Sequence, residues 1–209
     1  DVYKRQVWDT DEDQIEYSDG FATHKSDPEL KLSFKEIAAA SNATGGPIVG
    51  SAGVNPGGVG GSYSAMIVDV DVDPETGKTD VVRCTAFTDA GKAIHPDYVE
   101  GQIQGGSVQG IGWALNEEYF MSDDGNVLNA SLLDYRMPTS LDLPMIDPVV
   151  IEVPNPGHPF GVRGVGESPL VPPLAAVANA IHDATGVRMS ELPMSPGVIL
   201  NALNDKNNS

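Results

Sequence analysis

The stretch that decides the fold is residues 96–115, which read PDYVEGQIQGGSVQGIGWAL. Pro96 follows His95, and proline is favoured at the first position of a helix, where an N–H would have no intrahelical partner. The stretch therefore predicts a helix that starts at about His95. It contains five glycines: Gly101, Gly105, Gly106, Gly110 and Gly112. Each glycine costs a helix roughly 1 kcal/mol relative to alanine, so packing or binding must offset that loss.

The spacing of these glycines predicts a helix surface without side chains. Two pairs are four residues apart, which places each pair on one side of a helix: Gly101 with Gly105, and Gly106 with Gly110. We expect one bare stripe, flanked by Gln102 and Gln109, whose amides can both donate and accept hydrogen bonds. Two interpretations remain open. Either another backbone packs on the stripe, with the glutamines at the surface, or a flat ligand does.

A second glycine-rich stretch, residues 161–169, reads GVRGVGESP and carries one carboxylate, Glu167. Glycines let a backbone approach a ligand closely. Pro169 and the two prolines that follow it keep this loop from becoming an early helical turn. Glu167 can therefore act as a base or an anion at a binding site. The alternative is a solvated carboxylate that is stabilised by the start of the next helix.

The remaining sequence predicts an α+β fold. Residues 62–73 alternate apolar and polar side chains, as a half-buried strand does, and residues 79–88 form a hairpin with them. The other expected elements are a capped helix over 33–40, a hairpin of 117–121 with 127–132, a strand over 149–153, a helix from 172 to 185 that Gly186 ends, and a last helix over 196–203. Antiparallel hairpins and helices in separate blocks are typical of this class.

Composition limits the classes of partner. The net charge is −18 and the isoelectric point about 4.3, so nucleic acid and anionic membranes would be repelled. The single cysteine, Cys84, excludes an intrachain disulfide and a cysteine-based metal site; we interpret it as a small buried side chain. The aspartates of residues 69–73 lack the glycine and glutamate of a calcium loop. No stretch is apolar enough to cross a membrane.

Four segments, in the family's order, resemble the C-terminal part of the molybdenum-cofactor-binding large subunit of the xanthine dehydrogenase, aldehyde oxidase and carbon monoxide dehydrogenase family. They are residues 70–77, 89–96 and 100–115, then 161–169 with the helix over 175–185. The resemblance implies that residues 31–203 are a C-terminal molybdopterin-binding domain. Residues 1–30 would be a poorly defined stretch of a truncated fragment, with 1–6 a remnant of cloning or sequencing, and 204–209 a disordered tail.

The resemblance also implies a site. In this family molybdenum is held by a pterin dithiolene and by oxo, sulfido and hydroxyl ligands, so no side chain is expected to bind the metal. Glu167 matches the general base that takes the proton from Mo–OH. Gln102 matches the glutamine that contacts the pterin, and Gly166 would bring its backbone close to the molybdenum centre. Arg163 would help to anchor the loop, and His158 would be structural or would face the substrate.

The resemblance implies a hydroxylase that oxidises a small heterocycle, an aldehyde or a similar substrate, with water as the oxygen source. The cofactors would be molybdenum–molybdopterin in its cytosine dinucleotide form, with two-iron two-sulfur clusters and FAD on partner subunits or domains. The protein would be a cytoplasmic hetero-oligomer with an iron–sulfur subunit and an FAD subunit, without nucleic-acid or membrane partners; the periplasm stays open because the N-terminus is missing. The fragment alone is expected to be inactive.

Two competing functions follow from the residues alone. In a non-catalytic binding or assembly domain, the glycine stripe would be a packing surface and Glu167 a helix cap. Convergence of Gln102 and Glu167 on one open concave surface would favour the enzyme, whereas opposite faces would exclude it. A hydrolase is disfavoured because the chain has neither a Gly-x-Ser-x-Gly nor a His-Glu-x-x-His motif.

Overall fold

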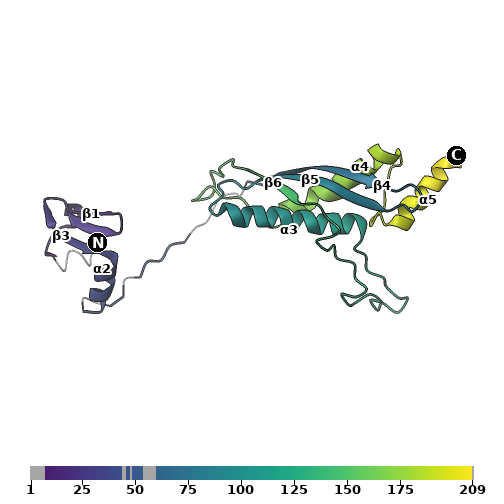
Figure 1. Ribbon diagram of the computed structural model, residues 1–209. Helices are drawn as coiled ribbons and strands as arrows, with labels where there is room; N and C mark the ends of the chain where they lie inside the picture. The colour runs from purple at the N-terminus through teal and green to yellow at the C-terminus, as the bar shows by residue number, and fades with distance from the viewer. Residues whose placement is uncertain (1–7, 44–45, 48, 54–59, 209) are drawn as a thin grey trace. The chain divides into compact units, whose positions relative to one another are not determined.

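The computed structural model describes residues 8–43, 46–47, 49–53 and 60–208 (Figure 1). The chain forms two compact units, residues 1–55 and 56–209, and each has its own sheet and its own apolar core. The boundary therefore differs from the expected change at residue 30, because the polar sequence up to that point contains strands. Residues 1–6, interpreted above as a remnant, lie outside the described residues.

The first unit is a three-stranded antiparallel sheet followed by a short helix. Its elements are η1 (Glu12–Gln14), β1 (Ile15–Ser18), β2 (Phe21–His24), β3 (Asp27–Ser33), α2 (Phe34–Ala40) and η2 (Ser41–Ala43). The strands are neighbours in chain order. The small core consists of Ala22 and Ile37, with three half-buried side chains around them.

The expected capping box begins α2. Ser33 Oγ accepts a hydrogen bond from the Glu36 N–H at 3.3 Å, and Glu36 Oε2 accepts one from the Ser33 N–H at 2.8 Å. Two N–H groups at the start of the helix are thereby satisfied. The Ser33 hydroxyl also donates to Glu36 Oε2, at 2.7 Å. This bond and, after it, the bond from the Ser33 N–H lower the pKa of Glu36, because they stabilise its ionised form.

The second unit is a three-stranded sheet with two helices packed on it. Its elements are β4 (Ser64–Val72), β5 (Thr79–Asp89), α3 (Pro96–Leu115), β6 (Ile146–Ile151), η3 (Ser168–Leu170), α4 (Val171–Thr185) and α5 (Pro196–Asn207). The strand order is β4-β5-β6. α3 lies against β5 and β6, and α4 lies against β4 and α3. The α+β class is as expected.

The alternation in β4 gives this sheet one covered face and one open face. Met66, Val68 and two further valines pack against the core, whereas Ile67 and the aspartates between them are exposed. Cys84 of β5 lies fully buried in the same core. Burial raises the pKa of its thiol to about 11, which agrees with its interpretation as a small core side chain.

Two elements depart from the expected antiparallel hairpins. β4 and β5 do form one, but β6 pairs with β5 in parallel, with α3 in the connection between them. The predicted hairpin of 117–121 with 127–132 has one isolated bridge, between Met121 and Val127. The side chain of Asn129 explains this, because it accepts from the Phe120 N–H at 3.0 Å and donates to the Glu118 carbonyl at 2.6 Å. A side chain thus occupies groups that a strand ladder would use.

The two C-terminal helices end differently from one another. Gly186 follows α4 in the left-handed region, with φ 71°, as predicted for a C-terminal glycine. α5 continues to Asn207, past the expected end at residue 203 and into the segment predicted as a tail. Lys206 Nζ donates to the Thr185 carbonyl at 2.7 Å, which ties the last turn of α5 to the end of α4.

Candidate functional site

The glycines of α3 serve two different surfaces, not one stripe. Each residue turns a helix by about 100°, so five residues make one full turn and about 140° more. The pair 106/110 therefore faces away from the pair 101/105. A Cβ atom at Gly106 would lie 3.1 Å from Pro169 Cβ, and one at Gly110 would lie 2.6 Å from Pro173 Cγ. The backbone of α3 therefore packs directly on η3 and on the first turn of α4. The first of the two interpretations thus holds for this pair.

The pair Gly101 and Gly105 lies on an open surface. A Cβ atom at either position would meet nothing within 4 Å. Gln102, between them in the sequence, is exposed, and its amide makes no hydrogen bond with any described residue. This part of α3 can therefore accept a group from outside the chain without steric conflict.

Residues 161–169, called the glycine–glutamate loop here, begin as an extension of the sheet. Val162 bridges to Gly91, the Arg163 N–H donates to the Ala90 carbonyl at 2.9 Å, and the Lys92 N–H donates to the Gly161 carbonyl at 2.9 Å. Gly91 has φ 65°, and a Cβ atom there would overlap the Gly161 carbonyl, so only glycine fits. The start of the loop is thus fixed to the end of β5.

Arg163 anchors the loop, which is the role that the family resemblance implied for it. Its Nε lies 3.1 Å from Asp89 Oδ2, and both side chains are nearly buried. Sequence reasoning did not assign a role to Asp89, although the residue opens one of the four segments of the family resemblance. The signal that could have found it is the carboxylate at the last position of β5, directly before Ala90 and Gly91.

The other end of the loop is fixed by η3, which begins directly after Glu167. Glu167 stands at the N-terminal end of η3, but its carboxylate forms no capping hydrogen bond. The side chain is exposed and makes no hydrogen bond with any described residue. The helix-cap interpretation of Glu167 therefore has no hydrogen bond to support it.

The loop and α3 come together at Gly166. A Cβ atom at this position would lie 3.7 Å from Gln102 Oε1, so the two predicted cofactor contacts are neighbours. Glu167 is the next residue, and both it and Gln102 are exposed. The structure thus brings the three predicted site residues to one region, at the N-terminal half of α3.

His158 lies in a local turn before this loop. Its Nδ1 accepts from the Phe160 N–H at 3.3 Å. The buried Asn155 is a second residue that sequence reasoning missed: its amide donates to the Val162 carbonyl at 3.3 Å and accepts from the Gly157 N–H at 3.0 Å. These bonds favour a structural role for the turn.

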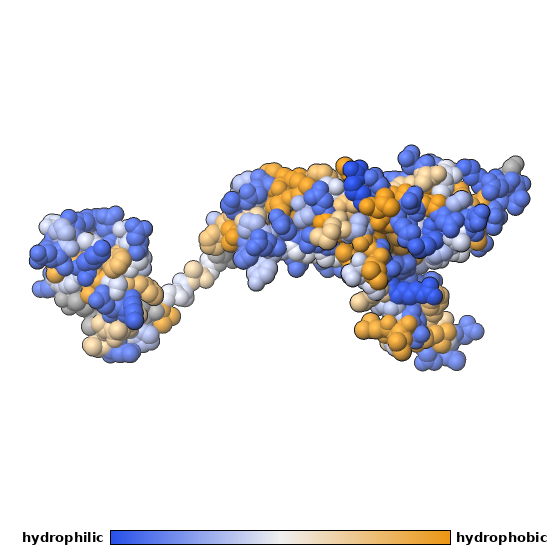
Figure 2. All heavy atoms as spheres, viewed as in Figure 1, coloured by the Kyte–Doolittle hydropathy of each residue, from blue (hydrophilic) through white to orange (hydrophobic). Residues whose placement is uncertain are grey.

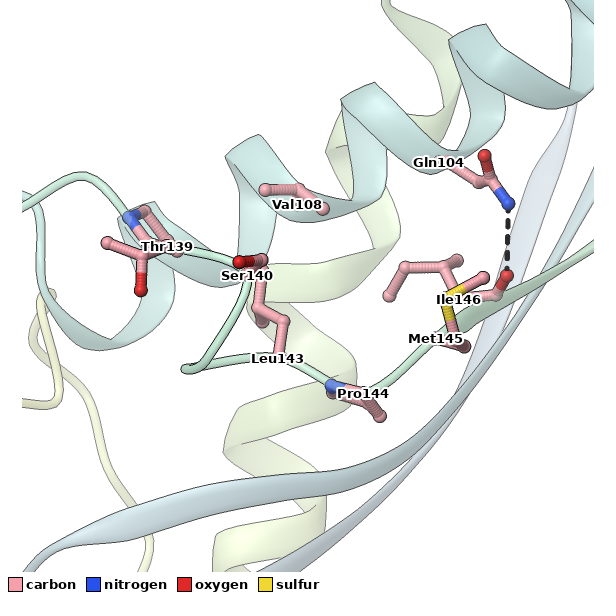
Figure 3. A pocket seen from close by; sticks show the side chains of 9 residues that line it. Gln104, Val108, Thr139, Ser140, Leu143, Pro144, Met145 and Ile146 are labelled. Carbon is pink, nitrogen blue, oxygen red and sulfur yellow. Dashed lines mark hydrogen bonds between the residues drawn. The ribbon is translucent and has the colours of Figure 1, made fainter.

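A separate cavity of about 380 Å³ lies between α3 and residues 138–146. Figure 3 shows Gln104 and Val108 on the α3 side, and Gln104 Nε2 donates to the Ile146 carbonyl at 3.3 Å. The lining includes neither Gln102 nor Glu167, so the cavity is not part of the predicted site. Among the described residues, no cluster of three or more His, Cys, Asp or Glu side chains could hold a metal ion, and no helix there could span a membrane.

The sequence pattern of the molybdopterin cofactor-binding domain matches residues 2–144, which is more than half of the chain. The chain belongs to this family. A similar protein is the carbon monoxide dehydrogenase large chain of Afipia carboxidovorans. The present chain is 33% identical to it over 182 residues, which is 85% of this chain and 21% of that one.

Other relatives carry different substrates in their names. The 6-hydroxypseudooxynicotine dehydrogenase complex subunit gamma of Paenarthrobacter nicotinovorans is 39% identical over 137 residues, 64% of this chain and 17% of its own. The solved structure of a Cu,Mo-CO dehydrogenase matches 99% of this chain and 27% of its own chain, with a TM-score of 0.82 and 27% identity. The chain therefore spans about a fifth of the length of the curated relatives it matches.

Proposed function

We propose that this chain is part of a molybdenum hydroxylase large subunit, in which Glu167 is the general base and Gln102 and Gly166 contact the cofactor. The observation that carries the proposal is the approach of Gly166 to Gln102 Oε1, 3.7 Å from where a Cβ atom would lie. It supports the enzyme over an assembly domain, because the loop and the glutamine meet at one exposed region.

The residues at this region fit a molybdopterin group. The open surface over Gly101 and Gly105 leaves room for a flat ring system, and the Gln102 amide can both donate and accept hydrogen bonds to a pterin edge. When bound, the cofactor would carry the water-derived oxygen that enters the substrate and would take up two electrons. The protein side would hold it through Gln102 and through the backbone at Gly166.

Glu167 would act as the general base that takes the proton from the nucleophile. A carboxylate without a hydrogen-bond partner among the described residues is available to accept a proton from the nucleophile, and water is the source of the oxygen. The substrate would be a small heterocycle, an aldehyde or a similar molecule. The name "complex subunit gamma" of one relative and "large chain" of another support a multi-subunit enzyme, for which we propose iron–sulfur and FAD partners and a pterin cytosine dinucleotide.

The test is Glu167→Gln in the intact, assembled enzyme. Glutamine keeps the size and hydrogen-bonding capacity of the side chain but cannot take up the proton, so cofactor binding should persist. A positioned general base contributes about 10²–10⁴ in rate, and the rate of anaerobic single-turnover reduction by substrate should fall by at least that factor. Molybdenum content is measured in parallel. A variant with full molybdenum content that is reduced at a near wild-type rate would remove Glu167 from the mechanism.

A further inference from the structure

The ion pair between Arg163 and Asp89 differs from the other ion pairs of the described residues. Its side chains are 10% and 11% exposed, whereas the pair Arg83–Asp69 has side chains that are 66% and 48% exposed. A buried pair is far less screened by water than a surface pair. The contact therefore holds its two segments together firmly, and losing one partner would leave a charge uncompensated.

Asp89 joins two strand ends through its second oxygen. Oδ1 accepts hydrogen bonds from the Gly91 N–H at 2.9 Å and from the Val153 N–H at 3.1 Å. One carboxylate thus fixes the turn after β5, the segment after β6 and the guanidinium of Arg163.

Arg163 adds a third segment. Its Nη1 donates to the Gly61 carbonyl at 2.7 Å, and its Nε donates to the Val153 carbonyl at 3.0 Å. The planar guanidinium presents several donors in a rigid fork, so contacts to three segments also fix its orientation. The backbone of Arg163 is held by the same site, because its N–H donates to the Ala90 carbonyl.

The other end of the loop is connected to the same aspartate. Ser62 Oγ donates to the Asp89 carbonyl at 2.8 Å and lies 3.2 Å from Ser168 Oγ, at the start of η3. Between these two anchors a Cβ atom at Gly164 would meet nothing within 4 Å, and one at Gly166 would meet only Gln102. The position of Glu167 therefore depends on its two anchors, and Asp89 contributes to both.

We propose that Asp89 and Arg163 are positioning residues that hold Glu167 in its reactive place beside Gln102. The inference rests on the proposed function of Glu167. A shift of about 1 Å in a reacting group can cost about 10²-fold in rate, so loosening the loop should slow the reaction without removing the cofactor.

The test uses Asp89→Asn in the intact enzyme. Asparagine can still accept both backbone N–H groups, but it lacks the charge that holds Arg163. We expect single-turnover reduction by substrate to slow by about 10–100-fold at unchanged molybdenum content. Arg163→Met should slow it similarly, and Arg163→Lys should slow it less because the charge remains. The matched control is Asp69→Asn, which breaks the exposed pair with Arg83 and should leave the rate unchanged.

A double-mutant cycle separates positioning from a general structural role. If Asp89 acts through Glu167, then Asp89→Asn should cause no further slowing in the Glu167→Gln enzyme. The inference is overturned by equal slowing in both backgrounds, by a wild-type rate in Asp89→Asn, or by molybdenum loss that accounts for the whole decrease. If one of these results is found while Glu167→Gln is slow, the positioning role of Asp89 is wrong but the proposed function of Glu167 stands. A fast Glu167→Gln enzyme removes the proposed function itself.

Discussion

At the scale of single residues, the proposed site depends on polar side chains that have no partner within the described part of the chain. Gln102 and Glu167 are both exposed, and neither side chain bonds to another described residue, whereas the nearby Asp89 and Arg163 are bonded on several sides. Asp89 and Arg163 therefore stabilise the structure, whereas Gln102 and Glu167 are available to a ligand. Substitutions in the two pairs should therefore have different consequences.

Gln102→Ala in the intact subunit should lower cofactor occupancy and not only the rate. Losing one partner of a buried polar contact costs roughly 1–3 kcal/mol, which is about 5–150-fold in affinity. Gln109→Ala is the matched control, because Gln109 is also an exposed glutamine of α3 but lies two turns farther along the helix. Molybdenum per subunit is the measurement. Normal content with normal turnover in Gln102→Ala would place Gln102 outside the cofactor contacts.

At the scale of elements, the glycine-rich helix α3 combines a packing surface with an open one. Gly106 and Gly110 let η3 and α4 approach its backbone, and Gly101 and Gly105 leave space. The sequence correctly predicted a helix with bare positions and a β4–β5 hairpin, because both follow from local periodicity. It could not predict which glycines were covered, since that depends on where residues 169–173 return to the helix.

Gly110→Ala and Gly105→Ala should therefore have opposite effects on stability. A Cβ atom at position 110 would lie 2.7 Å from the Leu170 carbonyl, and overpacking costs typically about 1–3 kcal/mol. At position 105 alanine has free space and should stabilise the helix by up to about 1 kcal/mol. The thermal midpoints of the two intact variants give the comparison.

Cofactor binding by Gly105→Ala should fall, even though the stability of this variant should rise. We expect Gly105→Ala to combine a stable fold with reduced molybdenum content, because its methyl group would occupy the proposed cofactor surface. If Gly105→Ala retained full molybdenum content, the open pair would not face the cofactor.

The elements that the sequence failed to predict are those decided by a single side chain or by distant contacts. The side-chain amide of Asn129 takes the place of hydrogen bonds between strands, and the secondary-structure propensity of the residues does not predict this. Lys206 extends α5 by bonding to the end of α4. The anchoring of the loop by Asp89 likewise joins strand ends that are far apart in the chain, so the sequence around Asp89 does not show which groups it contacts.

At the scale of the whole molecule, the second unit exposes apolar surface that a free domain would rarely carry. The segment of residues 117–137, called the arm here, protrudes after α3 and gathers apolar residues (Figures 1 and 2). Leu133 is 96% exposed and Leu132 79%. The chain covers about a fifth of the length of its curated relatives, and an isolated chain would leave this surface in water.

The purified 209-residue chain should therefore be inactive, should retain no molybdenum cofactor, and should bind a hydrophobic dye such as ANS. The cofactor would be enclosed only partly, because the surface over Gly101 and Gly105 is open. Leu133→Gln with Leu132→Gln should reduce dye binding without changing the core. Stoichiometric molybdenum in the purified chain would contradict this expectation.

The anchoring of the glycine–glutamate loop also sets the order in which parts of the second unit can form during translation. Arg163 bonds to a residue 102 positions earlier in the chain, and Ser62 contacts Ser168 across 106 positions. A ribosome that adds about 5–20 residues per second needs roughly 5–20 s to pass from one partner to the other. α3 is synthesised within that interval, before the segment that packs on Gly106 and Gly110. The proposed site is thus among the last parts of the second unit to form as the nascent chain emerges, so a cofactor that binds at this site would be inserted after translation of this region and would not guide its earlier folding.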